Sequence, residues 1–388
     1  MTSTRRSLLK AGVAGLLTLP RSYASASQQG QSFESWRRDF EASVPARLNA
    51  AKVPGAAVAI ASKKGGTRYA TAFGFADIEQ MRKLTPETPM HLASVSKLFT
   101  ASALVQLFER RRLDLHSDVN TFIDFPVRNP RHPRIPITPH QLITHTSSIS
   151  DEGYGDVSFP GDPKQSLSSF LKDYLVKGGA TYSQHSFLNA EPGAKWDYCN
   201  VAVALAGYVV EHVSKQSFSS YVETNILQPL GIHNAHWYLK DFAPNVLAKP
   251  YELENGRLVA LPQQGYPDVP AGMLRCSVSD LASSLRAMIG ADAGERAILS
   301  ERAVAEMLRR QVDPKIYAYQ GLGWTEEETT TQKFVGHSGS DNGALNMVAL
   351  TGDRNHAVAV LLNVDGTPAT SSFRASMVDD LLVGAKLA

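Results

Sequence analysis

The sequence predicts an α/β protein of the α+β kind, in which helices flank an antiparallel sheet and an all-helical lobe is inserted into it. Strand-like runs occur at residues 56–61 and 67–75, and they return at residues 345–350 and 357–362. The stretch between them, about residues 98–245, contains the main helix-patterned runs. Both ends of the chain are therefore expected to build one sheet lobe. An active site is expected between the lobes, because ligand sites favour such junctions.

Short-range patterns predict the first elements. Residues 33–51 carry mixed charge with apolar residues at helical spacing, which predicts a surface helix packed on the sheet. Gly65-Gly66 separates the first two strand-like runs and predicts a hairpin. From Leu98 to Phe108 one apolar stripe predicts a core helix, which the arginines at 110–112 end.

The later elements follow from turn residues and periodicity. Five prolines between residues 126 and 139 exclude a helix there, and a short helix is expected from Gln141 to His145. Residues 201–213 are apolar and helix-patterned. The segment Gly352-Asp353-Arg354-Asn355 predicts the turn of a C-terminal hairpin, and residues 371–388 are expected to form a closing helix.

Length and composition restrict the class of protein. The chain has 388 residues, of which 43% are hydrophobic and 20% charged, as in a soluble globular protein with one large two-lobed domain. We expect this domain to span residues 27–388, with a sheet lobe at about 33–97 and 246–388 and a helical lobe at about 98–245. The net charge of +2 favours neither a nucleic acid nor a membrane surface as partner.

Residues 1–26 are predicted to be an export signal. Thr4-Arg5-Arg6-Ser7-Leu8-Leu9-Lys10 resembles a twin-arginine signal; an apolar stretch from Ala11 to Leu19 follows, and Ala24-Ser25-Ala26 then supplies a small-residue cleavage site. The apolar stretch is too short to span a bilayer. Removing this segment takes away four basic residues and no acidic one, which reverses the net charge to −2. A periplasmic or secreted protein without a membrane anchor is therefore expected.

Cysteine and histidine spacing predicts no metal site and leaves a disulfide open. The only cysteines are Cys199 and Cys276. An oxidising compartment permits a disulfide between them but does not require one. His233 and His236 have ligand-like spacing, but no further motif accompanies them, so a turn after Pro229-Leu230-Gly231 is the favoured interpretation. No cofactor is predicted.

The first chemical candidate is the pair Ser94 and Lys97, at the start of the predicted core helix. Positions i and i+3 of a helix share one face, so the amine would lie beside the hydroxyl. A neutral amine can take the proton of a serine that attacks a carbonyl group, and burial favours the neutral form. The spacing alone is weakly specific, since it recurs at Ser7–Lys10 and at Ser169–Lys172, where an ordinary surface pair is expected.

Two further motifs give the pair its context. Tyr198-Cys199-Asn200 and His337-Ser338-Gly339 each occur once, in that order and far apart. Together with Ser94-x-x-Lys97 they resemble the serine β-lactamase and penicillin-binding-protein superfamily, and most closely its branch of class C β-lactamases, DD-peptidases and related esterases. The resemblance covers roughly residues 33–385. It is reinforced by Gly74-Phe75-Ala76-Asp77, Leu142-Ile143-Thr144-His145-Thr146-Ser147, Glu191-Pro192-Gly193, Pro229-Leu230-Gly231 and Pro270-Ala271-Gly272.

The resemblance implies a β-lactamase-like fold and assigns three catalytic roles. Ser94 would be the nucleophile that forms an acyl-enzyme, and Lys97 would assist its deprotonation. Tyr198 would act as general base and later as general acid, if nearby cations favour its ionised form. Taken singly, a tyrosine is more often a core aromatic; the ordered set favours function. Cys199 and Ser96 are expected to be spacers, and His145 is expected to order a loop.

The same resemblance implies the substrate-binding and oxyanion residues. Asn200 would position the substrate and Lys97 by hydrogen bonding. His337-Ser338-Gly339 occupies the place of a Lys-Thr-Gly motif, and His337 would shape the electrostatics around the substrate carbonyl or carboxylate. The backbone N–H groups of Ser94 and Ser340 would form the oxyanion hole.

Departures from the family pattern bear on the substrate. His-Ser-Gly in place of Lys-Thr-Gly occurs among esterases and some DD-peptidases, which weakens the case for a dedicated β-lactamase. Ser148 and Met273 stand where relatives commonly carry glycine, and both positions are expected in loops that contact substrate.

The sequence leaves more than one function open. The first is an exported serine hydrolase of a small-molecule ester, amide or D-alanyl peptide, either carboxylesterase-like or carboxypeptidase-like, with weak β-lactam turnover as a possible side activity. The alternative is a penicillin-binding sensor that is acylated but does not turn over. An α/β-hydrolase is disfavoured, because the chain lacks a G-x-S-x-G elbow.

Overall fold

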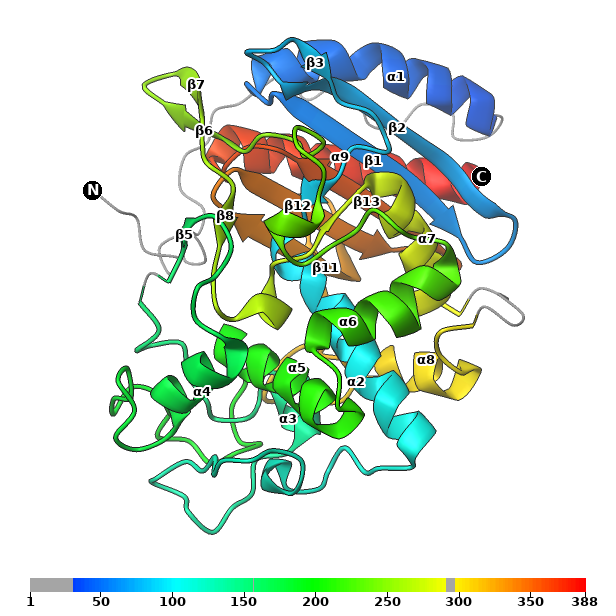
Figure 1. The fold of residues 1–388 in the computed structure, drawn as a ribbon. Coiled ribbons are helices and arrows are strands. Elements are labelled where there is room, and N and C mark those ends of the chain that lie inside the picture. Colours follow the sequence, from blue (N-terminus) through cyan, green and yellow to red (C-terminus); the bar gives the residue numbers. More distant parts are fainter. Residues whose placement is uncertain (1–30, 156, 291–296) are drawn as a thin grey trace.

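A seven-stranded antiparallel sheet organises the molecule, with the strand order β10-β11-β12-β13-β1-β2-β3 (Figure 1). The computed structural model describes residues 31–155, 157–290 and 297–388, so the predicted export signal lies outside the described residues. The strands of this sheet are β1 (Gly55–Ser62), β2 (Gly66–Asp77), β3 (Arg82–Lys83), β10 (Thr325–Glu328), β11 (Lys333–Asp341), β12 (Ala344–Leu350) and β13 (His356–Leu362). Strands from the two ends of the chain meet where β1 pairs with β13, which confirms the predicted fold class.

The helices of the described residues are α1 (Phe33–Ala50), α2 (Lys97–Arg111), α3 (Pro139–Ile143), α4 (Leu167–Leu175), α5 (Asn200–Ser214), α6 (Phe218–Val222), α7 (Val278–Met288), α8 (Glu301–Met307) and α9 (Pro368–Leu387). The longest helices are α1 and α9, which cover one face of the sheet, and α2 and α5 in the helical region. Short two-stranded pairs join β4 (Met90–His91) to β9 (Arg275–Cys276), β5 (Phe159–Pro160) to β8 (Gln264–Gly265), and β6 (Tyr251–Glu254) to β7 (Arg257–Ala260).

Strand β1 is buried on both faces and separates two hydrophobic cores. Ala56, Val58 and Ile60 face the core formed with α1 and α9, whereas the alternate residues Ala57 and Ala59 face the core formed with α7 and the helical region. Successive side chains of a strand point to opposite faces, so this β1 sequence can serve both cores at once. Figure 1 shows α1 and α9 together on one side of the sheet.

Helices α2 and α5 pack against each other at the centre of the helical region. In α2 every residue from Lys97 to Phe108 is buried, and Arg112 ends the helix in a left-handed conformation at φ 54°. In α5 the buried run extends from Val201 to Val210, and Lys215 ends it at φ 63°. Because α2 is buried on all sides, its first residue, Lys97, carries an amine into the interior of the protein.

Most predicted elements are present with shifted ends. The helices expected at 33–51 and 201–213 and both hairpins are confirmed. The short helix expected from Gln141 begins earlier, because Thr138 and Gln141 form a capping box with Pro139 in the first turn. The closing helix also begins earlier than expected, at Pro368, because Thr367 is its N-cap and forms a capping box with Thr370. Within the described ranges no helix is long and apolar enough to cross a membrane.

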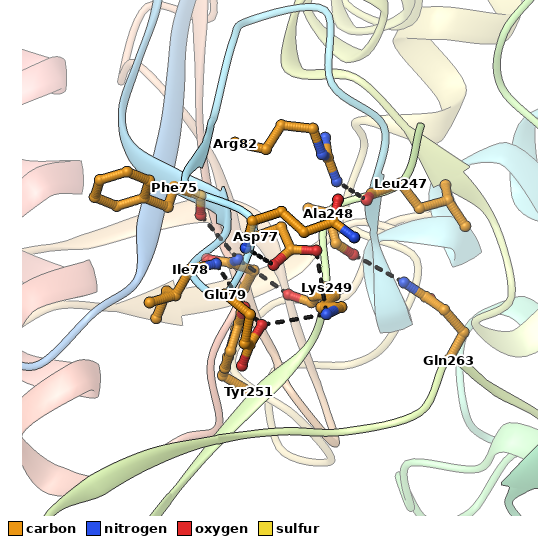
Figure 2. A network of polar contacts seen from close by, with 12 residues as sticks. Phe75, Asp77, Ile78, Glu79, Arg82, Leu247, Ala248, Lys249, Tyr251 and Gln263 are labelled. Atoms are coloured by element: carbon orange, nitrogen blue, oxygen red, sulfur yellow. Dashed lines mark hydrogen bonds and ion pairs between the residues drawn. The ribbon is translucent and has the colours of Figure 1, made fainter. Parts of the chain in front are cut away.

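A polar network fastens the end of β2 to the segment that precedes β6 (Figure 2). Lys249 Nζ lies 3.1 Å from Asp77 Oδ2 and 3.2 Å from Glu79 Oε2, and the Tyr251 hydroxyl donates to Glu79 at 2.9 Å. Asn363, which follows β13, donates to the carbonyls of Phe75 and Lys249. This network therefore ties the N-terminal hairpin and the C-terminal strand to the chain that leads toward residues 268–273.

Candidate active site

Ser94 lies in a short 3₁₀ turn, Ala93–Ser96, that leads directly into α2. The residue before it, Ala93, adopts a left-handed backbone conformation at φ 48°. Such strain in a non-glycine residue persists only where the surroundings over-determine it. Gly339 of β11 lies against this turn, since a Cβ there would be 2.4 Å from the Leu92 carbonyl oxygen. The glycine thus allows β11 to approach the serine closely.

Lys97 is 2% exposed and its amine contacts three oxygen atoms. Nζ lies 3.0 Å from Ser94 Oγ, 2.8 Å from Asn200 Oδ1 and 2.5 Å from the carbonyl oxygen of Ala271. The last two oxygens can only accept hydrogen bonds. In the protonated form Nζ can donate to all three oxygens; in the neutral form its two hydrogens can go to Asn200 and Ala271, and its lone pair would then face Ser94. The arrangement is suited to removing the serine proton.

Tyr198 lies next to this pair, and its ring packs against that of His145. Its ring centroid is 5.0 Å from Lys97 Nζ and 4.5 Å from the centroid of the His145 ring. His145 is buried, and its Nδ1 accepts a hydrogen bond from the backbone N–H of Cys199 at 3.2 Å. His145 therefore does more than order a loop, because it supports the face of the tyrosine ring and the start of α5.

His337 is buried on β11, with its ring centroid 6.4 Å from that of Tyr198. Its Nδ1 donates to the Ser338 carbonyl oxygen at 2.7 Å, which leaves Nε2 as an acceptor in the neutral ring. Burial and the charge of Lys97 lower the pKa of His337 to about 4. The histidine is therefore neutral at pH 7, unlike a lysine at the same place.

The outer edge of β11 is not paired with β10 beyond Gly336, where the strand reaches the Ser94 turn. The N–H of Ser338 donates instead to Glu327 Oε1 at 2.8 Å. Burial raises the pKa of Glu327. Backbone groups alternate along a strand, so the N–H of Ser340 points to the same edge as that of Ser338. Ser340 itself is exposed.

The structure brings together residues that the sequence analysis drew from three distant motifs. Ser94, Lys97, Asn200, Tyr198 and His337 form one connected cluster, although their catalytic roles stay predictions. Ser169 and Lys172 lie on α4, where Lys172 pairs with Asp124 at 3.0 Å, as expected for a surface pair. Cys199 and Cys276 are both buried and free.

Three contributors were missed by the sequence analysis. The Ala271 carbonyl contacts Lys97, Asp151 contacts Asn200, and Glu327 contacts Ser338. The Pro-Ala-Gly segment was noticed only as a flanking resemblance, and nothing in the local sequence marks the two carboxylates. Ser148, noted for replacing a glycine, adopts φ 62°, a left-handed conformation that glycine tolerates best.

Because His145 and His337 are buried, we expect the protein to be less stable in mild acid. Burial lowers the pKa of His145 well below its ordinary value of 6.5, and that of His337 is about 4. Between pH 4 and 6.5 the unfolded chain takes up protons that the folded chain does not, so stability falls as the pH drops through this window. At pH 5 we expect His337 alone to lower the free energy of unfolding by about 2 kcal/mol relative to pH 7.5.

Urea denaturation at pH 5, 6 and 7.5 measures this effect. His337→Gln should reduce the pH dependence, with His185→Gln, a change at a half-exposed surface histidine, as the control. A wild-type stability that is constant from pH 7.5 to 5 would contradict the assignment of a buried neutral histidine.

Comparison with known proteins identifies the family. The model of the Beta-lactamase family matches residues 40–380. Protein flp of Staphylococcus aureus is 24% identical over 319 residues, which cover 82% of this chain and 61% of that protein. Esterase EstB of Burkholderia gladioli is 30% identical over 199 residues, covering 50% of each chain. The chain thus spans about three-fifths of the length of the flp relatives.

A solved structure supports the same conclusion. The octameric penicillin-binding protein homologue from Pyrococcus abyssi is 28% identical, with a TM-score of 0.70 over 90% of this chain and 77% of that chain. The family match extends over the sheet, the helical region and all the residues that cluster around Ser94. The chain belongs to the Beta-lactamase family and has the β-lactamase fold.

Proposed function

We propose that this protein is an exported serine hydrolase that cleaves an ester or amide through an acyl-enzyme on Ser94. The observation that carries the proposal is the buried Lys97 amine, 3.0 Å from Ser94 Oγ and held by the oxygens of Asn200 and Ala271. Export is proposed from the twin-arginine pattern and the small-residue cleavage site in residues 1–26.

In the proposed acylation, Ser94 Oγ attacks the carbonyl carbon while its proton passes to the basic cluster of Lys97 and Tyr198. The tetrahedral intermediate collapses with cleavage of the bond to the leaving alcohol or amine, which takes up a proton from the same cluster. Water then attacks the acyl-enzyme, its proton goes to the cluster, and the carboxylic acid leaves as Ser94 Oγ is reprotonated. The N–H groups of Ser94 and Ser340 would receive the oxyanion.

The neutral His337 favours an uncharged acyl donor. Its Nε2 is an acceptor at pH 7, and an acceptor does not attract a substrate carboxylate. A carboxylesterase-like activity is therefore supported more strongly than the release of a C-terminal D-alanine. The relative named Esterase EstB is consistent with this preference.

Tyr198→Phe tests the proposed acid–base role. The substitution keeps the ring that stacks on His145 and removes only the hydroxyl, so the fold should be retained. We expect kcat for an ester to fall by about 10²- to 10⁴-fold, in line with the loss of a general acid–base catalyst. Tyr317→Phe, a change in an aromatic that stacks on Trp196, serves as control. A Tyr198→Phe enzyme with nearly wild-type kcat would remove Tyr198 from the mechanism.

Wild-type protein with three probes tests the function itself. A p-nitrophenyl ester, a D-alanyl-D-alanine peptide and a fluorescent penicillin are each incubated with the protein; turnover is followed, and the adduct is located by peptide mass spectrometry. The proposal expects many turnovers of the ester and a transient acyl group on Ser94. One stoichiometric burst with a persistent adduct would instead indicate a penicillin-binding sensor. A covalent adduct on another residue would refute the Ser94 mechanism.

A further inference from the structure

The carboxylate of Asp151 receives a convergent set of hydrogen bonds at the start of α5. Oδ2 accepts from the backbone N–H of Asn200 at 2.7 Å and from Asn200 Nδ2 at 2.9 Å. Oδ1 accepts from the backbone N–H of Val201 at 3.1 Å and lies 3.1 Å from the Cys199 thiol. One side chain thus contacts the three residues that directly follow Tyr198.

We propose that Asp151 is a positioning residue that fixes the orientation of the Asn200 side-chain amide and, through it, the direction of the Lys97 lone pair. The inference rests on the proposed hydrolase function and adds a residue that acts one contact away from the reacting atoms.

The two ends of the Asn200 side-chain amide differ in their hydrogen-bonding chemistry. An amide has one end that donates and one end that accepts, and a 180° turn about its last bond exchanges them with little change in shape. An ionised carboxylate can only accept hydrogen bonds, so Asp151 selects the Nδ2 end of Asn200. The Oδ1 end is thereby directed to Lys97, 2.8 Å away.

The opposite orientation would be unfavourable for catalysis. It would direct Nδ2 of Asn200 at the Lys97 amine, so that two donors would face each other. The amine would lose one of its two fixed acceptors, Asn200 Oδ1 and the Ala271 carbonyl. The hydrogens of a neutral Lys97 amine could then turn toward Ser94 Oγ, and its lone pair would be directed away from the serine proton.

Asp151 is itself held in place by the loop that carries it. The Ser150 carbonyl oxygen accepts from the Tyr174 hydroxyl at 2.6 Å, and the Ser150 N–H donates to the Ser186 carbonyl at 3.0 Å. Its negative charge also lies at the N-terminus of the 15-residue helix α5, where the helix dipole favours an anion. The carboxylate is therefore anchored from both sides, as a positioning group requires.

The nearly isosteric change Asp151→Asn separates orientation from packing. An asparagine keeps one oxygen, which can still accept from the Val201 N–H. An NH₂ group in the place of Oδ2 loses the bond from the Asn200 N–H, but it can donate to Asn200 Oδ1 and so permits the reversed amide. We expect kcat for a p-nitrophenyl ester to fall by about 10²-fold, the effect of a misplaced catalytic group. KM should change by less than about threefold, because no contact to substrate is removed.

Asp124→Asn is the matched control. Asp124 is also a carboxylate that contacts α5, through the Tyr208 hydroxyl at 2.7 Å, but it lies away from Ser94 and pairs with the surface residue Lys172. It should change thermal stability without lowering kcat. Should Asp151→Asn prove unstable, Asp151→Ser keeps an oxygen near the helix N-terminus and removes the carboxylate that selects Nδ2.

A double-mutant cycle with Asn200→Ala decides whether Asp151 acts through Asn200. Without the amide there is nothing to orient, so adding Asp151→Asn to Asn200→Ala should not slow the reaction further. Labelling of Ser94 by a fluorophosphonate, followed by intact mass, gives an independent rate for the same four proteins.

The outcomes separate this inference from the proposed function. A wild-type kcat in Asp151→Asn, or a full additional loss in the Asn200→Ala background, would overturn the inference while the hydrolase proposal stands. If the wild-type protein neither turns over the ester nor is labelled on Ser94, the proposed function fails, and the positioning role fails with it.

Discussion

Ser94→Ala is expected to lower kcat/KM for a p-nitrophenyl ester by at least about 10⁴-fold. The substitution removes only Oγ, the atom that would form the bond to the acyl group, from a partly exposed position. Lys97 would keep its contacts with Asn200 and Ala271. The fold and the melting temperature should therefore change little, and the loss would report on chemistry.

The chain supplies a matched control for this change. Ser169 has a lysine three residues later, as Ser94 does, but lies on α4 near the surface pair of Lys172 and Asp124. Ser169→Ala should leave ester turnover within about twofold of wild type. The acyl-enzyme mechanism is wrong if Ser94→Ala retains turnover and the adduct forms elsewhere.

Lys97→Met is expected to reduce kcat by about 10³-fold, because it removes the group placed to take the serine proton. Methionine is similar in length and fills the buried space, so gross collapse is not expected. The Asn200 and Ala271 oxygens each lose a donor, and an unsatisfied buried acceptor costs about 1–3 kcal/mol. A lower melting temperature should thus accompany the loss of rate.

Lys172→Met controls for the removal of a lysine from a Ser-x-x-Lys pair. It removes the surface ion pair with Asp124 and the contact of the amine with the Phe125 ring, neither of which involves the cluster around Ser94, so its rate should be that of wild type. Circular dichroism at the assay temperature checks that the Lys97→Met protein is folded. A folded Lys97→Met enzyme that is as fast as wild type would show that the serine is deprotonated by another group.

Local signals explain why much of the fold was predictable. The helix at Phe33–Ala50 shows its period within a few turns, and the hairpin of β1 and β2 is marked by Gly65-Gly66. The C-terminal hairpin is marked in the same way by the turn before His356. Strand β1 is buried on both faces, however, so its sequence shows no alternation of apolar and polar residues. The core that each residue faces could therefore not be predicted.

The candidate site was predictable only as a set of motifs. The order of Ser94-x-x-Lys97, Tyr198-x-Asn200 and His337-x-Gly339 indicated its chemistry, but the distances between them are a tertiary property. Asp151 was missed because its partner Asn200 is 49 positions away in the chain. Glu327 was missed because it reaches across the end of β10 to the neighbouring strand.

The sequence by itself determined the kinds of candidate catalytic groups, their order along the chain and the fold class that carries them. Only the tertiary structure decided that the Ala271 carbonyl would fix the lysine, that Asp151 would orient the asparagine, and that burial would keep His337 neutral. The physical reason is that residue types and periodicity are local, whereas hydrogen-bond direction and desolvation depend on which distant segments pack together.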